Sequence, residues 1–251
     1  MTITTYTWAL YAREVKRFQK IWLDTLATPI VSTVLYLVIF GVVAGGRTIP
    51  GTTYPAFVYA GLLGMMMVNS SFSNPTFALI LSKNVGTIID IQLAPIAPWQ
   101  VGIAYSLAAF TRGLFTVIAA TLITMWFIPG ASLVHPIMFI LGLLVTGMQF
   151  GMLGVTTGLL VKNFETLTLI MTFVMQPMIM LAGVFYPVST LPAPWAFVSQ
   201  LNPLHHNINL LRYGMIGYSD VNPLISLAVA LGVAVIVFVL MNNIAVRALK
   251  K

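Results

Sequence analysis

The stretch VNPLISLAVALGVAVIVFVLMNNIAV, residues 221–246, contains no charged side chain. About 20 consecutive apolar residues suffice for a helix to cross a bilayer, so this stretch predicts a membrane-spanning helix. The whole chain has the same character, because 59% of its 251 residues are hydrophobic and 7% are charged. Soluble domains carry about 25% charged residues, and outer-membrane barrel strands alternate polar and apolar positions. The composition therefore excludes both classes and predicts an all-α polytopic membrane protein.

The other long gaps between charged residues predict five more spans, which makes six in total. The breaker Ile128-Pro129-Gly130 separates the third span from the fourth. Six spans place both termini on the same side of the membrane. The predicted ranges of the first five spans are 25–46, 57–80, 99–127, 137–160 and 167–186.

The distribution of basic residues predicts which side this is. Nine basic residues share the side of the termini, whereas Arg47 and Arg212 fall on the other side and Arg112 falls inside a span. Lys and Arg accumulate in cytoplasmic loops, so both termini are predicted to be cytoplasmic. This asymmetry also accounts for the net charge of +7 without a nucleic-acid partner. The nine residues are Arg13, Lys16, Arg17, Lys20, Lys83, Lys162, Arg247, Lys250 and Lys251.

Residues 1–22 differ from the spans because they combine aromatic and charged side chains. Their apolar positions recur at helical spacing and their charged positions lie between them, which predicts an amphipathic helix lying on the cytoplasmic leaflet. The apolar positions are Trp8, Tyr11, Val15, Phe18 and Trp22, and the charged positions are Arg13, Glu14, Lys16, Arg17 and Lys20.

The sequence offers no catalytic residue and no metal site. It has no cysteine and no GxxxxGK[ST] loop, so it lacks that means of binding ATP. His205 and His206 are adjacent, which aims them in different directions and favours a structural role. No acidic residue falls within a predicted span, so a proton-coupled mechanism has no obvious proton carrier. The energy for any transport should therefore come from elsewhere.

The predicted loop between the second and third spans, residues 83–98, reads KNVGTIIDIQLAPIAP. A helix of about ten residues here would expose Ile88, Ile91 and Ile96 to water. Each buried aliphatic side chain is worth about 1.5–3 kcal/mol, so this helix should dock on something. Its own helical bundle and a partner protein are equally good candidates at this point.

The sequence resembles the type-2 ABC exporter permeases, a group that includes drug-efflux, nodulation-factor and polysaccharide export permeases. The resemblance rests on Asp90-x-Gln-Leu-Ala-Pro-Ile, on Leu201-Asn202-Pro203-Leu204-His205 leading to Arg212-Tyr213-Gly214, and on the six-span layout with its N-terminal helix. It covers essentially residues 1–251 as one domain. It implies a homodimer in the inner membrane, bound to separate cytosolic ATPase subunits that hold ATP and Mg, with no cofactor in this chain.

The resemblance also implies roles for two segments. Residues 83–98 would hold a coupling helix seated on the ATPase, with Ile88, Asp90, Ile91 and Leu93 as the coupling residues. Residues 187–221 would form short re-entrant helices at the outer face. The prolines in that segment predict helices near 193–200 and 204–217. Their side chains Trp195, Phe197, Leu201 and Leu204 are apolar enough for the headgroup zone.

The translocation path is implied to lie beside the second and fifth spans. Methionine packs adaptably, which suits a promiscuous path, although it also fills ordinary cores. The candidate path residues are Met65, Met66, Asn69, Phe72, Thr172, Met175 and Gln176.

Arg112 has two interpretations, because a charge inside a span is costly. It could pair within the bundle or extend to lipid phosphate, or it could contact substrate or water in the path. Two other functions also stay open for the chain, an ATP-independent transporter or channel and a membrane assembly protein that transports nothing.

Overall fold

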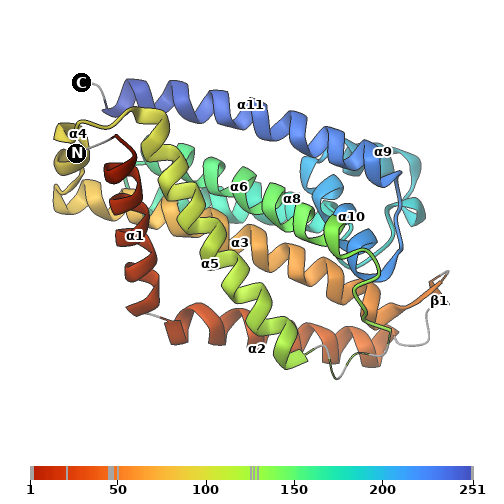
Figure 1. The fold of residues 1–251 in the computed structure, drawn as a ribbon. Helices are drawn as coiled ribbons and strands as arrows, with labels where there is room; N and C mark the ends of the chain where they lie inside the picture. Colours follow the sequence, from red (N-terminus) through yellow and green to blue (C-terminus); the bar gives the residue numbers. More distant parts are fainter. Residues whose placement is uncertain are drawn as a thin grey trace.

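The computed structural model describes residues 3–20, 22–44, 48–49, 51–124, 126, 128 and 130–249. These residues are almost entirely helical, and Figure 1 shows the long helices side by side along the length of the molecule. The helices are α1 (Ile3–Lys20), α2 (Trp22–Ala44), α3 (Tyr54–Val85), α4 (Ile88–Leu93), α5 (Pro98–Thr124), α6 (Pro136–Leu160), α7 (Phe164–Ile170), α8 (Gln176–Leu181), α9 (Ala193–Leu201), α10 (Pro203–Ile216) and α11 (Pro223–Leu249). A π-helix, η2 (Met171–Met175), joins α7 to α8, and a 3-10 turn, η3 (Val188–Thr190), precedes α9. Strands β1 (Thr48–Ile49) and β2 (Thr52–Thr53) form a short antiparallel hairpin.

Within the described residues, five helices are long and apolar enough to cross a membrane. They are α3, α5, α6, the continuous α7–η2–α8 segment and α11, and they correspond to the second through sixth predicted spans. The first predicted span corresponds to α2, whose apolar part is the shorter stretch Leu26–Phe40. The structure therefore gives five candidate spans, and the count of six stays a prediction.

Helix α3 lies in the middle of the bundle and is buried on almost every side. Close approach of neighbouring helices depends on glycine, as is common in membrane bundles. A Cβ on Gly154 of α6 would collide with the carbonyl oxygen of Phe72 in α3, and one on Gly61 of α3 would lie 2.6 Å from the carbonyl oxygen of Val184. These glycines therefore set how tightly α3 packs against its neighbours.

Most predicted helix bounds agree with the structure to within a few residues. Helices α9 and α10 lie where the prolines predict two short helices, and Asn202 caps α10 by accepting a hydrogen bond from the backbone of Leu204 at 3.0 Å. The fifth predicted span ends earlier than 186, at Leu181, because the chain turns at Gly183 with a positive φ of 80°. The third predicted span extends to Phe127, which lies outside the described residues.

The molecule has two distinct ends (Figure 1). Helices α1 and α4 and the last turn of α11 form one end, here called the α1–α4 end. The β1–β2 hairpin, α9 and α10 lie toward the opposite end, here called the α9–α10 end. Seven of the nine basic residues predicted to be cytoplasmic belong to segments at or adjoining the α1–α4 end, and Lys250 and Lys251 lie outside the described residues. Arg47 also lies outside them.

Candidate functional site

Helix α4 is bounded by two backbone features that the sequence specifies. Gly86 adopts a positive φ of 85° and ends α3. Ala94 is extended, at φ −66° and ψ 140°, because Pro95 disfavours the helical conformation of the residue before it. The helix between them has six residues, whereas about ten were predicted. The segment that could couple to a partner is therefore short and held between fixed turns.

One face of α4 packs on the bundle. The Ile91 side chain is 6% exposed and lies in an apolar cluster with Val101 of α5 and Leu249 of α11. Ile88 packs against the same cluster, and the Gln92 side chain donates to the carbonyl of Ala248 at 3.2 Å. Own-bundle packing, one of the two alternatives open from the sequence, thus applies to Ile88 and Ile91.

The other face of α4 is open. Leu93 is 79% exposed and Ile89 is 54% exposed, with Asp90 exposed between them. Of the four predicted coupling residues, only Asp90 and Leu93 are therefore presented fully to the outside. Ile89 was missed by sequence reasoning, although its spacing of four residues from Leu93 places both on one helical face.

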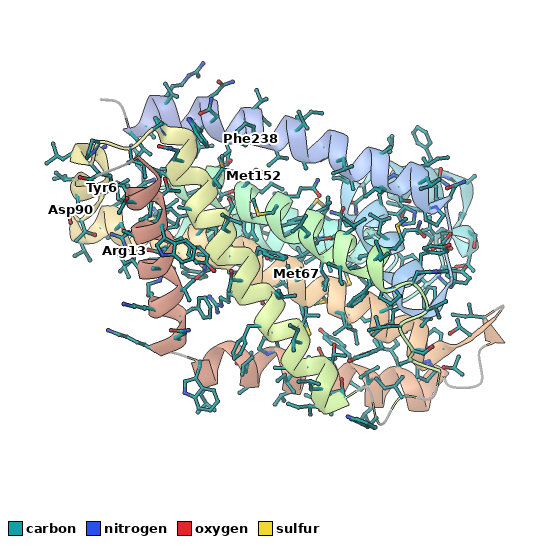
Figure 2. The ribbon with its side chains drawn as sticks, in the orientation of Figure 1. Tyr6, Arg13, Met67, Asp90, Met152 and Phe238 are labelled. Carbon is teal, nitrogen blue, oxygen red and sulfur yellow. The ribbon has the colours of Figure 1, made fainter. Side chains whose placement is uncertain are left out.

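A groove runs between α4 and the first half of α1. It encloses about 200 Å³ and is lined by Tyr6, Leu10 and Arg13 on one side and by Asp90 and Ile96 on the other. Figure 2 labels Tyr6 and Arg13 on α1 and Asp90 near them at the same end of the molecule. Helix α1 therefore contributes to the surface beside α4.

Only part of the charged face of α1 lies in solvent as the sequence predicts, because Arg13, Lys16 and Lys20 are exposed but Glu14 is not. Glu14 is buried, and its carboxylate pairs with Arg13 at 3.2 Å and with Arg17 at 2.9 Å. Arg13 also donates to the Tyr105 hydroxyl of α5 at 2.9 Å. A buried carboxylate is tolerated when it is paired, which is why this face can lie against the bundle. Meanwhile Trp8, predicted on the apolar face, is 68% exposed.

Arg112 joins this polar cluster from α5. Its guanidinium donates to the side-chain oxygen of Asn74 in α3 at 3.4 Å. Arg17 of α1 donates to the same oxygen and to the Asn74 backbone carbonyl, both at 3.1 Å. Asn74 thus links three helices. The pairing of Arg112 is within the bundle, and whether it also contacts a substrate stays a prediction.

The candidate path residues divide between two places. Met65, Met66 and Asn69 line a cavity of about 240 Å³ between α2 and α3, together with Ser32 and Tyr36 of α2. The lining of this cavity mixes apolar side chains with hydroxyl and amide groups. Phe72, one turn further along α3, is buried in the core and is not part of its lining.

The remaining candidates lie on the segment α7–η2–α8. Thr172 and Gln176 are exposed, and Met175 is buried in the core. None of the three lines the cavity between α2 and α3. The π-helix places Thr172, Phe173 and Gln176 on the open side of this segment. Within one chain, therefore, the two sets of path residues do not form a single site.

The α9–α10 end contains a second buried polar network. Arg212 is 0% exposed, and its guanidinium donates to the Gly183 carbonyl at 2.7 Å and pairs with Asp220 at 3.4 Å. It also lies 3.7 Å from the centre of the Phe57 ring. Tyr218 donates to Asp220 at 3.0 Å, and burial and the neighbouring Asp220 raise the pKa of Tyr218. Arg212 is therefore buried inside the protein, held by a carboxylate and two carbonyls, and its predicted place on the external side of the membrane stays a prediction.

The other predictions for the α9–α10 end concern the apolar side chains of α9 and α10 and the two adjacent histidines, and only some of them agree with the structure. Trp195, Phe197 and Leu201 are exposed on α9, as an interfacial helix requires, but Leu204 is fully buried against the core. His205 contacts the Ala182 carbonyl at 3.3 Å, and His206 contacts Ser226 at 3.3 Å. In the part of the chain that the structure describes, no group of three or more His, Asp or Glu side chains could hold a metal ion.

Long apolar helices packed around a buried α3 define the class of polytopic membrane proteins. Residues 5–216 match the protein family described as ABC-2 type transporter, and the chain belongs to that family. It is 33% identical over 235 residues to the inner membrane transport permease YadH of Escherichia coli (strain K12), covering 92% of this chain and 91% of that protein. It is 28% identical over 236 residues to nodulation protein J of Rhizobium meliloti (strain 1021), covering 89% and 85%. The chain is thus a membrane transporter subunit of the permease type.

Proposed function

We propose that this chain is the permease subunit of an ATP-driven exporter in the inner membrane, and that a separate cytosolic ATPase docks on α4. The observation that carries the proposal is the division of α4 into an anchored face and an open face. Ile91 is fixed to the bundle, whereas Ile89 and Leu93 are exposed beside Asp90. Each exposed aliphatic side chain forgoes about 1.5–3 kcal/mol of burial, which favours a protein partner on this face.

The connections of α4 support a role in transmitting force. It follows α3 after only Gly86 and Thr87, and it leads into α5 through the segment 94–97. Its buried face contacts α11 through Ile91 and Gln92. A partner that pushes on α4 would therefore act on three long helices together, which is the rigid-body motion that alternating access requires.

A second copy of the chain completes the proposed path. Thr172 and Gln176 are polar side chains exposed on a segment long and apolar enough to span a membrane. Lipid offers no hydrogen bonds to such groups, so protein or water should cover them. A homodimer that joins this face to the cavity lined by Met65 and Met66 would bring the two sets of path residues together around its axis.

The proposed orientation has both termini in the cytoplasm, α2 as the first of six spans, and α9 and α10 as re-entrant helices at the outer face. The concentration of Lys and Arg toward the α1–α4 end supports the orientation. The exposed Trp195 and Phe197 of α9 support a place in the headgroup region at the other end.

The test of this function uses a double substitution on the open face, Asp90→Lys with Leu93→Ser. The variant should be expressed and should unfold at the same temperature as the wild type, because both side chains are exposed. It should lose the ATPase that copurifies with the wild type in mild detergent, since truncating a central interface side chain costs about 2 kcal/mol, roughly thirtyfold in affinity. Mass spectrometry identifies and quantifies the ATPase.

The matched control is Ile91→Ser on the anchored face. It should lower the unfolding temperature of the permease, because it removes a buried aliphatic side chain from the cluster with Val101. Normal ATPase copurification with the open-face variant, or no ATPase with the wild type, would overturn the proposed docking.

A further inference from the structure

A second and larger cavity lies at the α1–α4 end, between the last turns of α1, the end of α3 and the start of α4. It encloses about 550 Å³, and we call it the α1–α3–α4 cavity. Its charged lining consists of Arg13, Lys16, Arg17 and Lys20 from α1 with Glu14 and Asp90. Four bases and two acids leave a net positive charge of two. None of the functions described so far uses this excess.

The positive charge is concentrated on α1. Arg13 and Arg17, and likewise Lys16 and Lys20, are four residues apart, so each pair places like charges on neighbouring turns and opposes helix formation. Glu14 relieves the arginine pair through its two ion pairs. In the described part of the chain, no acidic side chain pairs with Lys16 or Lys20. An anion between these two lysines would supply the missing charge.

Behind this cluster, outside the lining of the cavity, lie two buried donors without acceptors. Arg17 reaches from the cavity to Asn74, which Arg112 also contacts. Asn74 is 2% exposed, and no described residue accepts a hydrogen bond from its side-chain nitrogen or from Nε of Arg112. Clusters of cationic donors suit ligands with several acceptor oxygens, and phosphate is the common biological example.

The wall opposite α1 is apolar. Leu81 is 50% exposed and Val85 is 67% exposed, and both line the cavity from α3. Trp22, just beyond the end of α1, is also exposed and belongs to the residues that prefer the membrane interface. A ligand that binds the basic side chains of α1 and also packs on the apolar side chains of α3 has an anionic head and an apolar tail. Asp90 lies on the α4 side and repels an anion, which places the head on the α1 side.

We propose that the α1–α3–α4 cavity binds the phosphate group of an anionic phospholipid. Lys16 and Lys20 hold the phosphate, Arg17 supports it from the inner side, and the acyl chain lies along Leu81 and Val85. The lipid then compensates the charge of α1 and fixes α1 against α3.

The binding experiment uses the purified full chain in detergent micelles doped with dioleoyl phosphatidylglycerol or dioleoyl phosphatidylcholine, with inorganic phosphate as a third probe. The test variant is Lys16→Gln with Lys20→Gln, two exposed positions. Its control, Lys162→Gln with Arg247→Gln, removes the same charge from exposed positions that do not line the cavity. The measured quantities are the dissociation constant and the shift in unfolding temperature.

Phosphatidylglycerol should bind the wild type and raise its unfolding temperature, whereas phosphatidylcholine should do so at least tenfold more weakly. The test variant should bind phosphatidylglycerol at least tenfold more weakly, and the control should change by less than twofold. Equal binding of the two lipids, or equal loss in both variants, would overturn the site. If inorganic phosphate competes at the lipid's own concentration, the anion site stands and the lipid as its source is overturned. The experiment needs neither an ATPase nor transport, so its result is independent of the proposed function.

Discussion

The two arginine networks of this protein differ in how their positive charge is compensated. At the α9–α10 end, Arg212 is matched by one carboxylate, Asp220, and both side chains are almost fully buried. At the α1–α4 end, Arg13 and Arg17 share the single carboxylate of Glu14, and Arg112, which contacts Asn74, pairs with no carboxylate among the described residues. The first network is balanced within the chain. The second has an excess of positive charge.

The difference also extends to what surrounds each network. Arg212 is held by backbone carbonyls and by the face of the Phe57 ring, so it joins α10 to α3 and to the turn after α8. Arg17 and Arg112 meet instead on one neutral amide, that of Asn74. A balanced network needs nothing further and suits a fixed part of the molecule. An unbalanced network suits a surface that moves or that binds an anion.

The largest effect is expected from Arg212→Met, which would leave Asp220 buried without its partner. Breaking a buried ion pair costs about 3–5 kcal/mol, so the variant should express poorly or unfold at a much lower temperature. Thermal unfolding in detergent measures this. The double variant Arg212→Met with Asp220→Asn should recover part of the loss, since it removes the unpaired charge. A wild-type unfolding temperature in the single variant would show that this end is not held by the pair.

A smaller loss is expected from Glu14→Gln at the other end. The substitution removes the carboxylate shared by Arg13 and Arg17, but both guanidiniums are partly exposed, so water screens them. We expect a loss of about 1–2 kcal/mol, measured by the same thermal unfolding, and a loss that grows at low ionic strength. If the loss of stability in Glu14→Gln does not change with ionic strength, the excess positive charge at this end is already neutralised.

The smallest effect is expected for Arg112, compared as Arg112→Ala and Arg112→Lys. Its hydrogen bond to Asn74 is single and long, at 3.4 Å, and a bond of this kind contributes about 1 kcal/mol. Lysine can make one such bond, so Arg112→Lys should retain most of the stability that Arg112→Ala loses. Normal stability in both variants with equal loss of transport would shift the role of Arg112 to the translocation path.

The sequence predicts the helices of this protein better than the surroundings of its charges. Prolines and apolar runs define α9, α10 and the long helices because local backbone preferences decide those bounds. Burial of Glu14 could not be predicted, since helical periodicity treats every charge as exposed and ignores a partner on another helix. The pairing of Arg212 had one sequence signal, which is the acidic residue Asp220 eight positions later, beyond the turn at Gly217.

At α4 too, the sequence predicts the local structure but not the contacts with other helices. The spacing of Ile88 and Ile91, and that of Ile89 and Leu93, already separates two faces of α4. Which of the two faces is anchored depends on where α5 and α11 lie, and that is a property of the tertiary fold.

The length of α3 has a mechanical consequence. Its 32 residues measure about 48 Å at 1.5 Å per residue, and the hydrocarbon core of a bilayer is about 30 Å thick. One or both ends of α3 must therefore extend beyond the hydrocarbon, or the helix must tilt. With α4 attached at one end and Gly61 packed against Val184 near the other, α3 has the form of a lever with its pivot at the α9–α10 end. A rotation of about 10° about Gly61 would displace α4 by about 6 Å, because about 36 Å of helix separates Gly61 from Val85.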